Sequence, residues 1–208
     1  MISSILDFSR NDPNKGTLFD VRDGQTYTVV KIGNQIWTAE NFRYLPSIKE
    51  KGDLYENSWV YENNNDYMDK GYGRLYDFNT ANHIAPEGWR LPNNKDFKEL
   101  RVFITKDNNL PKNSNKVGNY LKSVEGWDKP CDGIVNLDKY GFNAKPAGRV
   151  NSKPDNFTLV GGITFLWSYN YPNSWVLCCI DGDLFCNLNN YSINNRVDGF
   201  SVRLIKSQ

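Results

Sequence analysis

Several kinds of residue are scarce in this chain, and each shortage excludes a class of protein. Its 208 residues include one histidine, His83, and four cysteines, Cys131, Cys178, Cys179 and Cys186, at spacings that fit no zinc motif. Lys and Arg number 25 against 24 Asp and Glu and are mixed along the chain, so no basic stripe could follow a nucleic acid. No apolar run approaches membrane-spanning length. We therefore expect no metal, no cofactor, no nucleic acid and no membrane span.

The cysteines also lack the pattern of a disulfide framework. Cys178 and Cys179 are adjacent, so on a strand they would point to opposite faces, and at most one could face the core beside a partner. We expect free thiols.

The first fifteen residues contain neither the basic start nor the apolar stretch of a secretion signal. We expect either that no signal peptide exports the chain or that the signal has been removed. The segment is polar and includes the turn-forming run Asn11-Asp12-Pro13-Asn14. It therefore predicts a flexible or docking arm at residues 1–15, ahead of a single domain at 16–208 that is long enough to bury its own core.

The order of polar and apolar residues predicts short strands and short helices. Tyr27 and Val29 alternate with threonines as in a strand, Gly33-Asn34 fits a two-residue hairpin turn, and a return strand begins at residues 35–37. Residues 46–72 show no clear period and predict a long surface excursion. Residues 157–205 predict short strands joined by turns. The expected class is α+β, with short antiparallel sheets and two or three short helices.

The helices are expected in the middle of the chain. One covers about residues 78–84, and a weak one covers residues 117–124, with apolar side chains on one face up to Val124. The clearest follows Pro92, with Asn93 or Asn94 as its N-cap and apolar residues at helical spacing from Phe97.

Four residue types are missing from residues 154–205, which we call the C-terminal segment. Lys, Glu, Gln and Met account for 26 of the first 153 residues and for none of these 52, where about nine would be expected at that rate. No codon that ends in C or T encodes these four types or Trp, and only Trp167 and Trp175 break that rule here. β-rich sheets also disfavour Lys and Glu, so an ordinary explanation stays open.

The C-terminal segment has the composition of a binding surface. Its aromatic residues stand among Asn, Ser, Asp and Gly, as in antibody loops, where rigid rings supply contact area and small polar residues adapt their hydrogen bonds. If Val176, Leu184 and Leu188 face inward, alternation turns Trp175 outward, although packing in the core stays an alternative for each aromatic residue. The candidate ligand-binding residues are Tyr169, Tyr171, Trp175, Asp181, Asp183, Phe185, Asn187, Asn189, Asn190, Tyr191, Asn194 and Arg196.

Short islands of sequence occur in a characteristic order along almost the whole chain. They are Asp20–Tyr27, Ile32–Trp37, Ala39–Asn41, Gly73–Tyr76, Pro86–Pro92, Leu121–Lys122, Gly141–Phe142, Pro146–Gly148, Trp167–Ser168 and Gly199–Arg203. Most have a structural interpretation: Trp37 and Trp89 fill a core, Arg90 bonds backbone carbonyls or a buried carboxylate, and the glycines mark turns or close backbone approaches.

This ordered series resembles the Fibrobacter succinogenes major paralogous domain family, from about residue 16 to residue 206. The resemblance implies a C-type-lectin-like fold, in a fold group that also contains formylglycine-generating enzymes and the variable proteins of diversity-generating retroelements. One position departs from the family, whose closing Ser-Val-Arg run is usually followed by Cys. Here Leu204 follows Arg203, so a disulfide through that position is absent.

The resemblance to the variable proteins suggests a function. As a class these proteins are diversified by substitution at template adenines, commonly within Asn codons. Such codons can change to codons for many residues but never to those for Lys or Glu. The composition of residues 178–195 fits this restriction. We expect a ligand- or receptor-binding domain displayed on a phage tail or a bacterial surface. Its expected partners are a cell-surface protein or glycan and a tail or envelope component docked through residues 1–15, and a homo-oligomer is left open.

Three other functions were weighed. A formylglycine-generating enzyme needs paired reactive cysteines, but neither Lys nor His lies near Cys178, Cys179 and Cys186 to activate a thiolate, so we expect no enzyme. The signatures of calcium lectins are missing, and Asp181 with Asp183 is too small a carboxylate set for calcium, while a structural calcium ion elsewhere stays open. A structural or accessory envelope domain without diversification stays open, because fold alone does not assign function.

Overall fold

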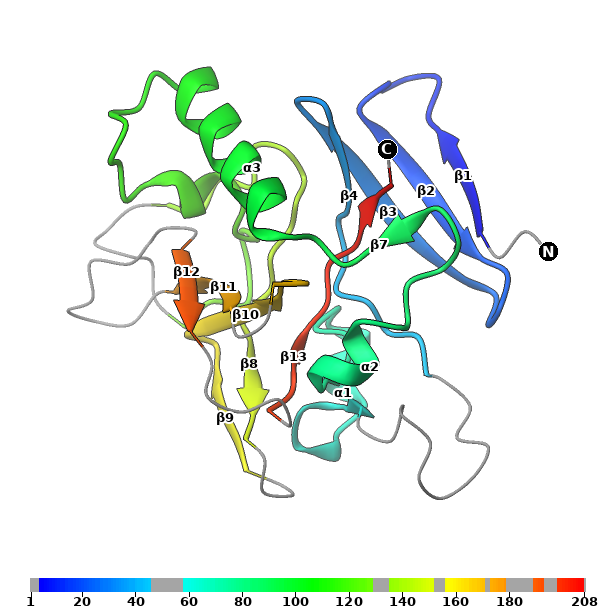
Figure 1. The fold of residues 1–208 in the computed structure, drawn as a ribbon. Coiled ribbons are helices and arrows are strands. Elements are labelled where there is room, and N and C mark those ends of the chain that lie inside the picture. Colours follow the sequence, from blue (N-terminus) through cyan, green and yellow to red (C-terminus); the bar gives the residue numbers. More distant parts are fainter. Residues whose placement is uncertain are drawn as a thin grey trace.

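The computed structural model describes residues 4–45, 58–128, 135–151, 156–170, 173–178, 189–192 and 198–207. These residues form an α+β structure in which strands predominate and helices are few, as expected (Figure 1). The chain from β13 to β14 runs through the middle of the molecule (Figure 1).

The first sheet is antiparallel throughout and joins early and late parts of the chain. Its strands lie in the order β1, β2, β3, β4, β14, β7. Ile205 of β14 pairs with Trp37 of β4 on one side and with Arg90 of β7 on the other. The bounds are β1 Ser4–Phe8, β2 Lys15–Asp20, β3 Gln25–Ile32, β4 Gln35–Thr38, β7 Trp89–Arg90 and β14 Ile205–Lys206.

The second sheet is mixed, and here the expectation of antiparallel sheets was wrong. Its order is β12, β11, β10, β13, β6, β5, with β8 beside β10 and β9 beside β8. The pairs Leu166↔Ser201 and Thr164↔Gly148 are parallel, because β13 and β8 reach β10 from other parts of the chain and not through a hairpin. The bounds are β5 Ser58–Trp59, β6 Leu75–Tyr76, β8 Ala147–Val150, β9 Phe157–Val160, β10 Ile163–Trp167, β11 Asn173–Cys178, β12 Asn189–Ser192 and β13 Phe200–Ser201.

The main helix begins where its sequence predicts. Asn93 is the N-cap and its side chain accepts from the N–H groups of Lys95 and Asp96, while the Asp96 carboxylate accepts from the Asn93 N–H. No helix in the described ranges is long and apolar enough to cross a membrane. The bounds are α1 Asp66–Asp69, α2 Phe78–Ala81 and α3 Asn94–Asp107, with 3-10 helices η1 Tyr61–Asn63 and η2 Val117–Tyr120.

The weaker helix predictions were too long. The helix α2 ends at Ala81 and not at residue 84. The stretch expected to be helical over residues 117–124 is a 3-10 turn that ends at Tyr120, and Val124 is 67% exposed. The long surface excursion is also corrected in part, because Tyr61 and Tyr72 are buried in a small apolar cluster.

The predicted hairpin at the start of the domain is confirmed. Ile32 of β3 pairs with Gln35 of β4, so Gly33 and Asn34 form a two-residue turn. Gly33 has φ 61°, and a Cβ there would lie 2.8 Å from a ring carbon of Phe103 on α3. Glycine is therefore required both by the turn and by the close approach of the helix.

The expectation of a flexible arm is wrong for Ser4–Phe8. This segment is β1, which pairs with β2 along its whole length, including Leu6 opposite Leu18. Leu6 packs against the buried cluster that contains Leu18. The polar run at residues 11–14 is the connection of a hairpin and not a hinge, because the Lys15 N–H donates to the Asp12 carbonyl.

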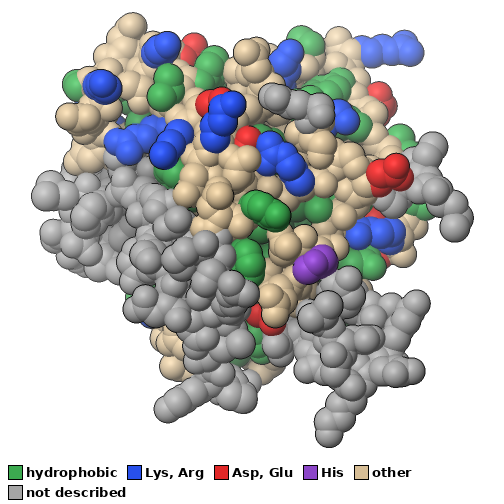
Figure 2. All heavy atoms as spheres, viewed as in Figure 1, with side chains coloured by type: hydrophobic (Ala, Val, Ile, Leu, Met, Phe, Trp, Pro, Cys, Tyr) green, Lys and Arg blue, Asp and Glu red, His purple; other side chains and the backbone are tan. Residues whose placement is uncertain are grey.

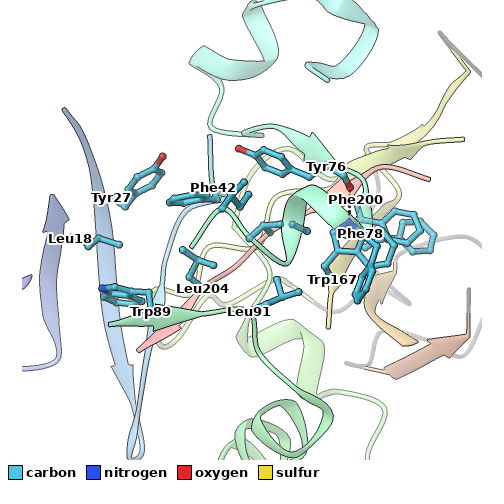
Figure 3. Close-up of a cluster of buried hydrophobic side chains, with 14 of the residues drawn as sticks. Leu18, Tyr27, Phe42, Tyr76, Phe78, Trp89, Leu91, Trp167, Phe200 and Leu204 are labelled. Carbon is cyan, nitrogen blue, oxygen red and sulfur yellow. Dashed lines mark hydrogen bonds between the residues drawn. The ribbon is translucent and has the colours of Figure 1, made fainter. Parts of the chain in front are cut away.

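Large aromatic side chains fill the core, as the islands predicted. Trp37 is fully buried and Trp89 is 6% exposed. In one cluster the rings of Tyr27 and Phe42 stack beside the first sheet, and Trp167 packs on Phe200 near the second (Figure 3). The cluster thus connects the two sheets.

A buried arginine ties three separate segments together. Arg203 is fully buried, and its guanidinium donates to the Asn41 side chain and to the carbonyls of Thr38, Phe142 and Asn143. The Cζ atom of Arg203 lies 4.8 Å from the centre of the Phe142 ring. Burial lowers the pKa of Arg203 to about 9, so the group stays protonated at neutral pH.

We predict that Arg203→Met lowers the free energy of unfolding by about 3 kcal/mol or more, because several buried acceptors lose their donor. Urea denaturation measures the change. Arg10→Met is the control, since Arg10 is exposed, and it should stay within about 0.5 kcal/mol of the parent. Equal midpoints for the two variants would contradict the role of Arg203.

Candidate ligand-binding surface

The loop after β10 is held against the first turn of α3. The Tyr169 N–H donates to the Pro92 carbonyl at 2.8 Å, and the Asn94 N–H donates to the side-chain oxygen of Asn170 at 2.8 Å. The Ser168 hydroxyl also donates to the Asn94 side chain. These bonds give the start of the β10–β11 connection a fixed position on the helix.

Trp175 does not face outward, and that expectation is wrong. Its side chain is 3% exposed, its ring stacks on Phe97 with 5.0 Å between ring centres, and its indole N–H donates to the Asn94 side chain at 2.9 Å. The alternation argument failed because β11 has buried neighbours on both faces. Trp175 enters one apolar cluster, while the next residue, Val176, packs against the other.

Tyr169 is exposed, as a ligand-contacting residue should be. Its side chain is 60% exposed and borders a groove of about 380 Å³, which we call the Tyr169 groove. Figure 2 views the molecule from a side on which the histidine is visible at the surface. The groove is lined by Asn82, His83, Ala85, Trp89, Arg90, Leu91, Asn93 and Tyr169.

The charge of Arg90, which lines the Tyr169 groove, is compensated in place by Asp96. Arg90 donates to both carboxylate oxygens of Asp96, at 2.6 and 2.8 Å, which raises the pKa of Arg90, and it also donates to the Leu91 carbonyl. The buried carboxylate expected as its partner is thereby confirmed. The Arg90–Asp96 pair also braces the first turn of α3, because Asp96 belongs to the capping box.

Most other candidate residues are only partly located. Asn189, Asn190 and Tyr191 lie on β12, whose backbone pairs with β11, so that Asn190 is opposite Trp175. Outside the described residues lie Tyr171, Asp181, Asp183, Phe185, Asn187, Asn194 and Arg196.

The cysteine prediction stays untested. Cys131, Cys179 and Cys186 lie outside the described residues, and Cys178 is placed only as the last residue of β11. Among the described residues, no group of three His, Cys, Asp or Glu side chains is placed to hold a metal ion.

The sequence did not reveal Asn82, His83 and Asn93 as neighbours of Tyr169. They come from the end of α2 and from the N-cap of α3, roughly eighty residues earlier in the chain. Long-range hydrogen bonds bring the two regions together, from Tyr169 to the Pro92 carbonyl and between Asn94 and Asn170. The one available signal was the island Pro86–Pro92, which contributes Trp89, Arg90 and Leu91 to the groove.

The structure supplies part of the reason why Lys and Glu are missing from the C-terminal segment. All five residues of β10 are buried, and Phe200 and Ser201 of β13 are buried too. Buried strand positions rarely hold a charged side chain unless it is paired. The exposed Tyr169 shows that the segment also reaches the surface, where burial gives no such reason.

We predict that Trp175→Ala destabilises the domain by about 3–5 kcal/mol, because it removes a buried ring and its hydrogen bond. Trp175→Phe retains the stacking on Phe97 and should cost less. Tyr169→Ala should leave the melting temperature within about 1 °C, since that ring is largely exposed. A melting temperature unaffected by Trp175→Ala would place the indole at the surface.

Comparison with known proteins confirms the family resemblance from residue 30 onward, somewhat later than the expected start near residue 16. The model of the Fibrobacter succinogenes major domain matches residues 30–206, which include the Tyr169 groove and Arg203. No curated protein and no solved structure matches the chain. On the extent of the family match, the chain belongs to the Fibrobacter succinogenes major domain family.

Proposed function

We propose that this chain is a recognition domain that binds a cell-surface protein or glycan through the C-terminal segment and the adjoining Tyr169 groove. The observation that carries the proposal is the exposed ring of Tyr169 on a loop held rigidly against α3. A rigid aromatic side chain at the surface supplies contact area at little entropic cost. Because hydrogen bonds already hold Tyr169 and Asn170 on α3, binding would order little additional chain at these two residues.

The wider composition of the C-terminal segment supports the same role. Tyr171, Phe185 and Tyr191 stand among asparagines, and β12 lies at one end of the second sheet, where Asn189–Ser192 pairs with β11. Binding surfaces commonly combine a few aromatic anchors with small polar residues. Residues 169–196 are therefore the proposed contact region, without Trp175, whose side chain is buried.

The finer identity is also part of this proposal. The chain would have a C-type-lectin-like fold and act as the variable protein of a diversity-generating retroelement, displayed on a phage tail or a bacterial surface. Membership of the family and the α+β architecture support the fold, and the absence of Lys, Glu, Gln and Met from 52 residues supports diversification. A docking partner for residues 1–15 would have to contact β1 as part of the first sheet.

The gene itself tests diversification. We predict a near-identical copy of codons 165–205 close to the coding gene, differing only at adenines, with a reverse transcriptase gene beside it. Sequencing of the gene and its flanks provides the measurement. If no such copy exists, the retroelement assignment fails, and a binding or envelope domain without diversification remains.

Binding tests the recognition role. We predict that the labelled chain stains at least one strain in a panel of bacterial cells, and that Tyr191→Ala weakens staining by at least about tenfold, the loss expected for an aromatic hot spot. Flow cytometry provides the measurement, and Val124→Ala is the control because that side chain is 67% exposed elsewhere in the chain. Unstained cells throughout, or equal staining by both variants, would refute the proposed function.

A further inference from the structure

The Tyr169 groove has the size of a small-molecule site and walls from several elements. Its volume of about 380 Å³ falls within the range of roughly 300–1,000 Å³ typical of ligand pockets. Asn82 follows α2, Trp89 belongs to β7, Asn93 caps α3, and Tyr169 follows β10. Three of these elements are fixed to one another by the Arg90–Asp96 pair and by the bond between Tyr169 and Pro92.

Amide groups on its rim have unused hydrogen-bonding capacity. Asn93 uses its side-chain oxygen for two backbone N–H groups of α3, while its amide nitrogen has no acceptor among the described residues. The Asn82 side chain makes no hydrogen bond within the same set of residues, although its backbone caps α2. The Tyr169 hydroxyl adds a further donor and acceptor at an exposed position.

The charge and shape of the groove restrict its ligand. Arg90 is already bound to Asp96, so its charge is not available to an acidic ligand. Its apolar parts are the exposed Tyr169 ring and small portions of Trp89, Leu91 and Ala85, which are too limited for a lipid chain. A ligand that fits is uncharged, carries several hydroxyls and has one apolar face for an aromatic ring.

We infer that the Tyr169 groove is a subsite for a neutral saccharide, with one sugar ring against Tyr169 and its hydroxyls bonded to Asn82 and Asn93. This inference rests on the proposed function and specifies its ligand class. A protein ligand would need an interface of about 800 Å² on this chain, far more than the groove supplies. In this arrangement the groove provides a fixed sugar contact, while the C-terminal segment adds selectivity.

The test is a titration of the ¹⁵N-labelled full chain with uncharged methyl glycosides of glucose, galactose, mannose and N-acetylglucosamine. For at least one of them we expect saturable shifts of the Trp89 indole and Tyr169 amide signals, with a Kd on the order of 1 mM for a single ring. Tyr169→Ala and Asn82→Ala should each weaken binding at least fivefold at an unchanged melting temperature. Tyr169→Phe, which keeps the ring, should retain most of the affinity.

Two matched observations separate this inference from the proposed function. Val124→Ala is the control in the titration, and its Kd should equal that of the parent. The inference is overturned if no glycoside shifts groove signals, if the shifts map elsewhere, or if Tyr169→Ala binds as the parent does. Three outcomes together would overturn the sugar subsite alone. Tyr191→Ala would abolish cell staining, Tyr169→Ala would leave it intact, and periodate treatment of the cells would also leave it intact. The absence of any staining would overturn the proposed function.

Discussion

The buried guanidinium of Arg203 fixes the geometry on which the rest of the molecule depends. No carboxylate contacts it among the described residues. Its donors instead satisfy the Asn41 side chain and three backbone carbonyls, one at the end of β4 and two at residues 142–143. Such a charge is costly to bury unless its hydrogen bonds are satisfied, so the carbonyls have to stay in place. The residue after Arg203, Leu204, is buried in the core, and its N–H donates to the Thr38 hydroxyl.

From Arg203 a continuous set of contacts leads to the candidate binding surface. Asn41, which accepts from Arg203, donates to the Ser201 hydroxyl, and Ser201 of β13 pairs with Leu166 of β10. Tyr169 follows β10 and lies beside the N-terminal turn of α3, where residues 169–170 are hydrogen-bonded to Pro92 and Asn94. The exposed ring of Tyr169 is thus linked to the buried polar network of Arg203 through the pairing of β13 with β10.

Features set by neighbouring residues were predictable from the sequence, and features set by distant contacts were not. The Gly33-Asn34 turn and the Asn93 cap depend on chemistry within a few positions, and both were found as expected. The prediction that Trp175 is exposed was wrong because the alternation argument assumes that one face of the strand is exposed to solvent. Residues on both faces of β11 pack against apolar clusters. The Tyr169 groove joins residues about eighty positions apart, and no local pattern encodes that contact.

The place of β14 in the first sheet has a consequence for how the protein folds. This strand lies between β4 and β7, and its neighbour Leu204 bonds to a residue 166 positions earlier. The sheet therefore cannot close before Ile205 and Lys206 are free to pair, and until then β4 has one unpaired edge. Closing so long a loop carries an entropic cost and slows folding. Until β14 is in place, the edges of β4 and β7 are unpaired, and unpaired strand edges favour aggregation with other chains.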